Sequence, residues 1–100
     1  MSLSGQSLNA ATITGAGTSI LFDVPHSSHS LIVEVTGSPD ACTVHLEGTI
    51  DGVNWFGVAQ VTISSLITNV GNFPVMGTRA NLVSLSGGSS PTVSAWIAAA

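Results

Sequence analysis

Positive charge is almost absent from this chain of 100 residues. It contains no lysine and a single arginine, Arg79, and its formal net charge is -4. A protein that binds nucleic acid through the phosphates needs several Lys or Arg side chains to release counterions, so the composition excludes that class of function. A polybasic module that binds the membrane surface is excluded for the same reason. Charged residues of both signs make up only 6% of the chain, so it has too few titratable side chains for most kinds of catalytic site.

Long apolar runs and cysteines are also scarce. Ser, Thr, Gly or Asn interrupts the apolar stretches every few residues, so no segment approaches the ~20 apolar residues of a membrane-spanning helix. Residues 1–6 show no basic region followed by an apolar one, and we expect no secretory signal there. Cys42 is the one cysteine. It cannot form an internal disulfide, and we expect a small core residue made in a reducing compartment.

The residues that are abundant favour β-strands. Val, Ile and Thr together account for 28 residues, whereas the whole chain holds two Glu, two Gln and one Arg for the polar face of a helix. Residues 41–50 alternate strictly, with Cys42, Val44, Leu46, Gly48 and Ile50 on the apolar face. We predict an all-β fold, a single antiparallel β-sandwich or jelly roll of about eight strands, forming one domain over residues 1–100.

Turn residues divide the predicted strands. Asp51-Gly52 predicts a hairpin between strands 41–50 and 54–63. Glycines at 15–17 and the run 87–91 predict two further hairpins, one joining strands 11–14 and 19–24 and the other joining 79–86 and 92–98. The remaining predicted strands are 30–36, with Leu31, Val33 and Val35 on one face, and 66–73.

Three histidines, His26, His29 and His45, are the only groups suited to acid–base or metal chemistry near neutral pH. His26-x-x-His29, completed by His45 or Cys42, is a conceivable tetrahedral zinc set. However, His45 and Cys42 lie on opposite faces of one predicted strand and cannot share a metal without a bulge. We expect solvent-facing or interface histidines, and no metal site.

Catalytic patterns are equally weak. Glu34 and Glu47 could be cross-strand neighbours, as in a glycosidase carboxylate pair, or simply solubilising charges on outer faces. Residues 87–90, Gly-Gly-Ser-Ser, lack the Lys-Ser/Thr ending and the helix of a phosphate loop. No Gly-x-Ser-x-Gly elbow is present. We therefore predict that the protein is not an enzyme and uses no cofactor.

The few aromatic side chains offer a different kind of site. They are Phe22, Trp55, Phe56, Phe73 and Trp96. Trp55 and Phe56 are adjacent in a strand and must face opposite ways, and Trp96 must face away from Val93, Ala95 and Ile97. Exposed, coplanar Trp55 and Trp96 beside Glu47 or Asp51 would favour a carbohydrate-binding module. Burial of both indoles would exclude it.

The predicted strands lack the lysines that protect sheet edges from pairing with other chains. Residues 94–100 are nearly all apolar, which suits a contact with a neighbour, although a terminal strand completing its own sheet explains them nearly as well. We expect an assembly of copies. The candidate interface residues are Trp55, Phe56, Arg79, Trp96 and Ile97.

Two segments carry a resemblance to a known group of proteins. Residues 44–56, VHLEGTIDGVNWF, resemble the strand, Asp-Gly turn and Asn-Trp strand of small β-sandwich virion proteins of tailed bacteriophages. Residues 78–97, TRANLVSLSGGSSPTVSAWI, look like the closing hairpin of the same proteins. An Asp-Gly-x-x-Trp element also occurs in carbohydrate-binding sandwiches, so the combination of the two segments carries the resemblance.

The resemblance implies a virion structural protein, assembled in the host cytoplasm. Its most specific form is a decoration protein bound to the outside of the capsid as a homo-oligomer, for which a trimer is one arrangement. The implied partners are further copies of the chain and the major capsid protein, with neither nucleic acid nor membrane. A tail, neck or fibre component and a carbohydrate-binding module are the alternatives. The resemblance gives Trp55 a packing role, for which Phe56 competes.

Overall fold

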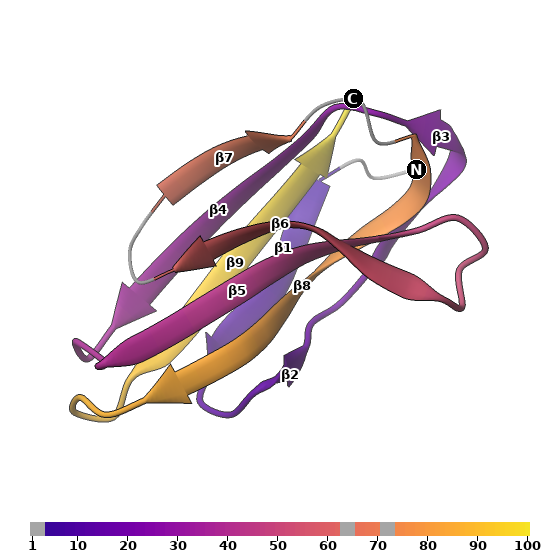
Figure 1. Ribbon diagram of the computed structural model, residues 1–100. Helices are drawn as coiled ribbons and strands as arrows, with labels where there is room; N and C mark the ends of the chain where they lie inside the picture. The colour runs from indigo at the N-terminus through magenta and orange to yellow at the C-terminus, as the bar shows by residue number, and fades with distance from the viewer. Residues whose placement is uncertain (1–3, 63–65, 71–73) are drawn as a thin grey trace.

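Two antiparallel β-sheets packed face to face form the part of the chain that the structure describes (Figure 1). The computed structural model describes residues 4–62, 66–70 and 74–100. The strands are β1 (Ser4–Ala11), β2 (Gly15–Ala16), β3 (Ile20–His26), β4 (His29–Thr36), β5 (Ala41–Thr49), β6 (Trp55–Thr62), β7 (Leu66–Val70), β8 (Val75–Ser86) and β9 (Thr92–Ala99). Within these ranges no helix is long and apolar enough to cross a membrane. The predicted all-β sandwich is confirmed.

Each sheet is named here after one of its inner strands. The first, called here the β9 sheet, has the order β1-β9-β4-β7, and the second, the β8 sheet, has the order β2-β8-β5-β6, with β3 also pairing with β8. The predicted hairpin at Asp51-Gly52 is confirmed, because β5 pairs with β6 from Thr43↔Thr62 to Thr49↔Trp55.

The other two predicted hairpins are wrong. β1 belongs to the β9 sheet, whereas β2 and β3 belong to the β8 sheet, and β8 and β9 also lie in different sheets. Residues 12–14 and the glycine-containing turn at 87–91 therefore carry the chain from one sheet to the other. The turns after β4 and β8 lie together at one end, where Ser89 N donates to Gly37 O at 2.8 Å and Asp40 N donates to Ser86 O at 2.8 Å (Figure 1).

The core lies between the sheets and follows the alternation of the strands. Its members are Leu8, Leu31, Val33, Cys42, Val44, Leu46, Val61, Ala80, Leu82, Val93, Ala95 and Ile97. Cys42 is 2% exposed, which confirms its predicted core position, and burial raises the pKa of its thiol. Ile50 was predicted on the same apolar face, but β5 ends at Thr49 and Ile50 is 67% exposed in the turn.

The apolar segment near the end of the chain is a central strand. β9 pairs with β1 on one side and with β4 on the other. Ala100 N donates to Ser28 O at 2.9 Å and Ser28 N donates to Ala100 O at 3.2 Å, which extends the pairing beyond β9. The sheet and its core thus account for the buried residues of this segment, Val93, Ala95 and Ile97, whereas Trp96 and Ala98 lie on the outer face.

A buried serine joins the two sheets. Ser7, on β1 of the β9 sheet, donates from Oγ to Thr18 O at 2.7 Å and accepts at Oγ from Ala80 N on β8 at 2.8 Å. Its carbonyl also accepts from Thr18 N at 2.8 Å. These bonds connect the edge strand β1 to the opposite sheet, because a buried amide or hydroxyl requires a partner.

Candidate functional site

The two tryptophans lie on opposite outer faces of the sandwich. On β5 the buried Val44 and Leu46 alternate with His45, Glu47 and Thr49, and Trp55 is the partner of Thr49, so the indole is on the outer side of the β8 sheet. Trp96 alternates with the buried Ala95 and Ile97, so it is on the outer side of the β9 sheet and faces away from the core as predicted. The two indoles therefore cannot form one coplanar platform.

Arg79 links the polar side chains around Trp55. Its guanidinium carbon lies 4.3 Å from the centre of the Trp55 ring, and its Nε donates to Glu47 Oε1 at 2.8 Å. Asn81 Nδ2 donates to Glu47 Oε2 at 3.0 Å. Burial by itself raises the pKa of Glu47, but the hydrogen bonds from Asn81 and Arg79 and the charge of Arg79 outweigh burial, so the pKa lies below its usual value. The chain's only strong cation thus stabilises an ionised carboxylate and covers one face of the indole.

Asp51 organises the turn between β5 and β6. One of its oxygens, Oδ1, accepts from the backbone N of Val53 and of Asn54, both at 2.8 Å, and Oδ2 accepts from Asn54 Nδ2 at 2.7 Å. The two backbone bonds are the main reason why the pKa of Asp51 lies far below its usual value. Thr49 Oγ1 donates to Asn54 O at 2.7 Å and closes the turn. Asp51 therefore has a structural role in this turn.

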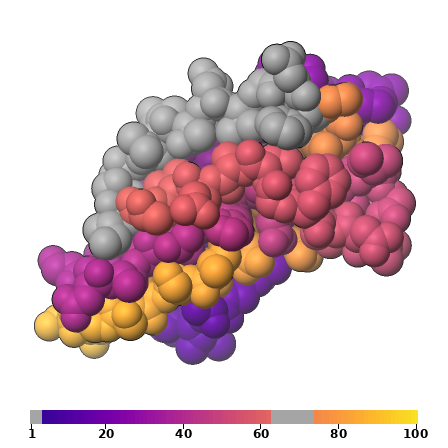
Figure 2. Space-filling view, in the orientation of Figure 1, coloured from indigo at the N-terminus to yellow at the C-terminus, as the bar shows by residue number. Residues whose placement is uncertain are grey.

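The same turn projects at one end of the molecule (Figure 2). Two of its apolar side chains are exposed, Ile50 at 67% and Val53 at 77%, and Phe56 at the start of β6 is 40% exposed. Trp55, the residue before Phe56 in β6, is half-buried. Because successive side chains of a strand point to opposite faces, the two residues face opposite ways, as predicted.

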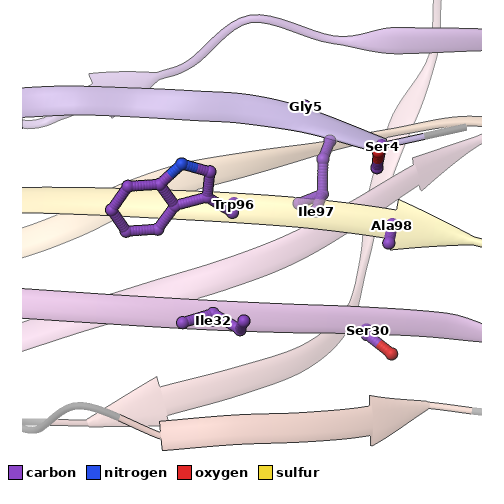
Figure 3. A pocket seen from close by; sticks show the side chains of 7 residues that line it. All are labelled: Ser4, Gly5, Ser30, Ile32, Trp96, Ile97 and Ala98. Atoms are coloured by element: carbon purple, nitrogen blue, oxygen red, sulfur yellow. The ribbon is translucent and has the colours of Figure 1, made fainter. Parts of the chain in front are cut away.

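A groove of about 340 Å³ runs over the outer face of the β9 sheet beside Trp96 (Figure 3). Its lining residues are Ser4, Gly5, Ser30, Ile32, Trp96, Ile97 and Ala98. The side chains form two rows across the strands. The registers Gln6↔Trp96 and Ile32↔Trp96 make a row of large residues, and Ser4↔Ala98 and Ser30↔Ala98 make a row of small ones. The hollow lies over the small row.

The histidines are not grouped. His29 is 2% exposed, and its ring stacks on Phe22 with 6.2 Å between the ring centroids. The predicted solvent-facing or interface position is therefore wrong for this residue. The ring of His26 also contacts Phe22, with 4.8 Å between the ring centroids, and its Nδ1 lies 2.8 Å from Val24 O. His45 is on the outer face of β5, where its Nε2 lies 3.1 Å from Gln60 Oε1. Among the residues described, no three His, Cys, Asp or Glu side chains could together hold a metal ion.

Of the two possibilities for Glu34 and Glu47, the cross-strand pair does not occur. Glu34 is on β4 of the β9 sheet and Glu47 is on β5 of the β8 sheet, and both are on outer faces. The two carboxylates are therefore separated by the thickness of the sandwich. The alternative, in which they are charges on outer faces, agrees with the structure.

The five candidate interface residues divide by location. Trp55 and Arg79 share the outer face of the β8 sheet, Phe56 is 40% exposed, and Trp96 lines the groove on the β9 sheet. Ile97 is 2% exposed and packs in the core. Ile32 is a further residue of this groove that was not among the candidates. The alternation that buries Leu31 and Val33 already assigns Ile32 to the outer face, where it is 42% exposed.

Comparison with known proteins identifies the fold. The chain matches no known protein family and no curated protein sequence. Among solved structures it is similar to the SPBc2 prophage-derived protein YomS, with a TM-score of 0.69, 12% identity, and coverage of 97% of this chain and 91% of YomS. It is also similar to PirA, with a TM-score of 0.57, 12% identity, and coverage of 100% of this chain and 95% of PirA. At this identity the likeness concerns the fold, and one of the two neighbours is of prophage origin.

Proposed function

We propose that this protein is a structural component of a tailed-phage particle, and specifically a decoration protein that binds the outer surface of the head as a homo-oligomer. The observation that carries the proposal is the pair of outer faces of the sandwich, each with one half-buried tryptophan. A decoration protein needs one surface for the capsid and another for its own copies, and tryptophan is enriched among the residues that dominate such contacts. The prophage origin of YomS and the sequence resemblance support the same assignment.

The polar side chains of the chain are also those expected of a structural protein. Glu47 is ionised and bonded to Arg79 and Asn81, Asp51 holds a turn, and the Cys42 thiol is buried with a raised pKa. Each of these groups has a structural contact that explains it. The energy of association would then come from buried interface area, as expected for a protein that reinforces an assembly.

The test is to locate the protein in particles. An antibody against the purified chain is applied to phage particles induced from the source strain, and the label is visualised by electron microscopy. Label distributed over the head surface is the expected result. Label on the tail, neck or fibres would replace the decoration role by the alternative structural one, and intact particles that lack the chain by both labelling and mass spectrometry would overturn the proposal. Specific binding in a glycan screen would instead support a carbohydrate-binding module.

A further inference from the structure

We propose that the outer face of the β9 sheet, centred on Trp96, binds the same face of a second copy of the chain across a two-fold axis. The inference rests on the homo-oligomer proposed above and specifies which surface forms it. A two-fold interface uses one surface patch on both subunits, so the patch must be complementary to itself. The face around Trp96 meets this condition in shape, in charge and in size.

Two rows of side chains give this face a self-complementary shape (Figure 3). The large row contains Ile32 and Trp96, and the small row next to it contains Ser4, Ala98 and Ser30. Neighbouring rows on one face of a sheet are two residues apart along each strand, or roughly 7 Å. A two-fold axis that lies between the rows and parallel to them sets the large row of each copy over the small row of the other. Each hollow of about 340 Å³ then receives a projecting side chain.

The outer face of the β9 sheet carries fewer charged side chains than the opposite face. Along β1, β9 and β4 the exposed and partly exposed polar residues are Ser, Thr, Gln and Asn, and the outward charged residue is one carboxylate, Glu34. For a chain with a net charge of -4, association of identical copies is unfavourable wherever carboxylates meet. Glu34 follows Ile32 on the side away from the small row, so the axis between the rows keeps the two Glu34 carboxylates apart. The face around Trp55 instead carries Arg79 and Glu47.

The face is also large enough for a specific interface between two copies. The β9 sheet has four strands, and its inner strands β4 and β9 have eight residues each. At about 3.3 Å per residue and about 4.8 Å between strands, the face measures roughly 26 by 19 Å, or about 500 Å². Two copies would therefore bury roughly 1,000 Å² in total, which is about the minimum for a specific interface.

The test is sedimentation velocity over a wide range of concentrations, on the wild type and three variants. Trp96→Ala removes the projecting side chain, and Ala98→Glu fills the hollow with a charge. Thr62→Glu adds the same charge on β6 of the β8 sheet and is the matched control. We expect a wild-type dimer, or a larger assembly with an even number of copies. The dissociation constant should rise at least about tenfold in Trp96→Ala and Ala98→Glu and stay unchanged in Thr62→Glu.

Circular dichroism and urea midpoints establish that each variant is folded, and Trp96→Ala carries the test if Ala98→Glu does not fold. A wild type that is monomeric at every concentration would overturn the inference, as would a dimer that both groove variants leave intact. A trimer unaffected by them would refute the two-fold interface and leave the proposed homo-oligomer standing. The particle-labelling experiment does not depend on any of these outcomes, so the two proposals can fail separately.

Discussion

Ser7→Ala tests whether the polar link between the sheets stabilises the fold. The substitution removes the hydroxyl that donates to Thr18 O and accepts from Ala80 N. Ala80 is 0% exposed, so its N–H is left without a partner and out of reach of water. An unsatisfied buried donor costs about 1–3 kcal/mol, whereas the carbonyl of the exposed Thr18 can bond to water. We expect a loss of about 2 kcal/mol in the free energy of unfolding, or a fall in Tm of roughly 10 °C for a domain of this size.

The assay is urea unfolding followed by tryptophan fluorescence at one fixed protein concentration. Ser94→Ala is the matched control, because Ser94 Oγ accepts from Ala10 N at 2.9 Å in an exposed bond. The control should change the free energy of unfolding by less than about 0.5 kcal/mol. A Ser7→Ala variant within that same margin of the wild type, with an unchanged m value, would refute the argument that this hydroxyl joins the sheets.

Three further predictions concern other parts of the β8 sheet. Because the pKa of Glu47 is lowered in the folded state, the carboxylate stabilises the fold above the usual pKa of 4.5, and this contribution is lost as the pH falls below that value. Glu47→Gln should therefore make stability depend less on pH in the acid range. Wild-type and variant curves that run parallel there would contradict this prediction. Gly77→Ala should cost about 1–3 kcal/mol, since its Cβ would come within 2.8 Å of the carbonyl oxygen of Ile20, whereas Gly57→Ala meets only an ordinary 3.8 Å contact and should be close to neutral in the same urea assay. The buried Cys42 thiol should react with a thiol reagent only in denaturant, and fast labelling of the native protein would show that the core is open there.

The strands could be predicted from the sequence because their signal is local. The alternation in residues 41–50 identified β5 and its buried Val44 and Leu46, and Asp51-Gly52 identified the hairpin that follows. The partner of each strand could not be predicted in the same way. A glycine-rich turn shows that the chain reverses, but Gly87 and Gly88 fit a turn between two sheets as well as a turn within one. For this reason the predicted number of about eight strands is close to the nine found in the described residues, whereas two of the three predicted hairpins are wrong.

The site was predictable to a similar extent. Alternation assigned Trp96 to an outer face, because its neighbours Ala95 and Ile97 have to fill the core. It could not show that Trp55 and Trp96 lie on opposite sides, since that depends on which sheet each strand joins. The burial of His29 against Phe22 likewise depends on β3 and β4 belonging to different sheets. Contacts between distant strands carry no local pattern.

The central position of β9 also determines when the β9 sheet can form during synthesis. β1 and β4 both pair with β9 and not with each other, so on a growing chain they have no common partner until residues 92–99 have left the ribosome. Until then each presents an unpaired edge, which is the situation in which strands of neighbouring nascent chains associate. A chain cut in the turn at 87–91 should accept a separate peptide of residues 92–99 as a donated strand. That exchange would turn the last step of folding into a binding reaction whose rate can be measured.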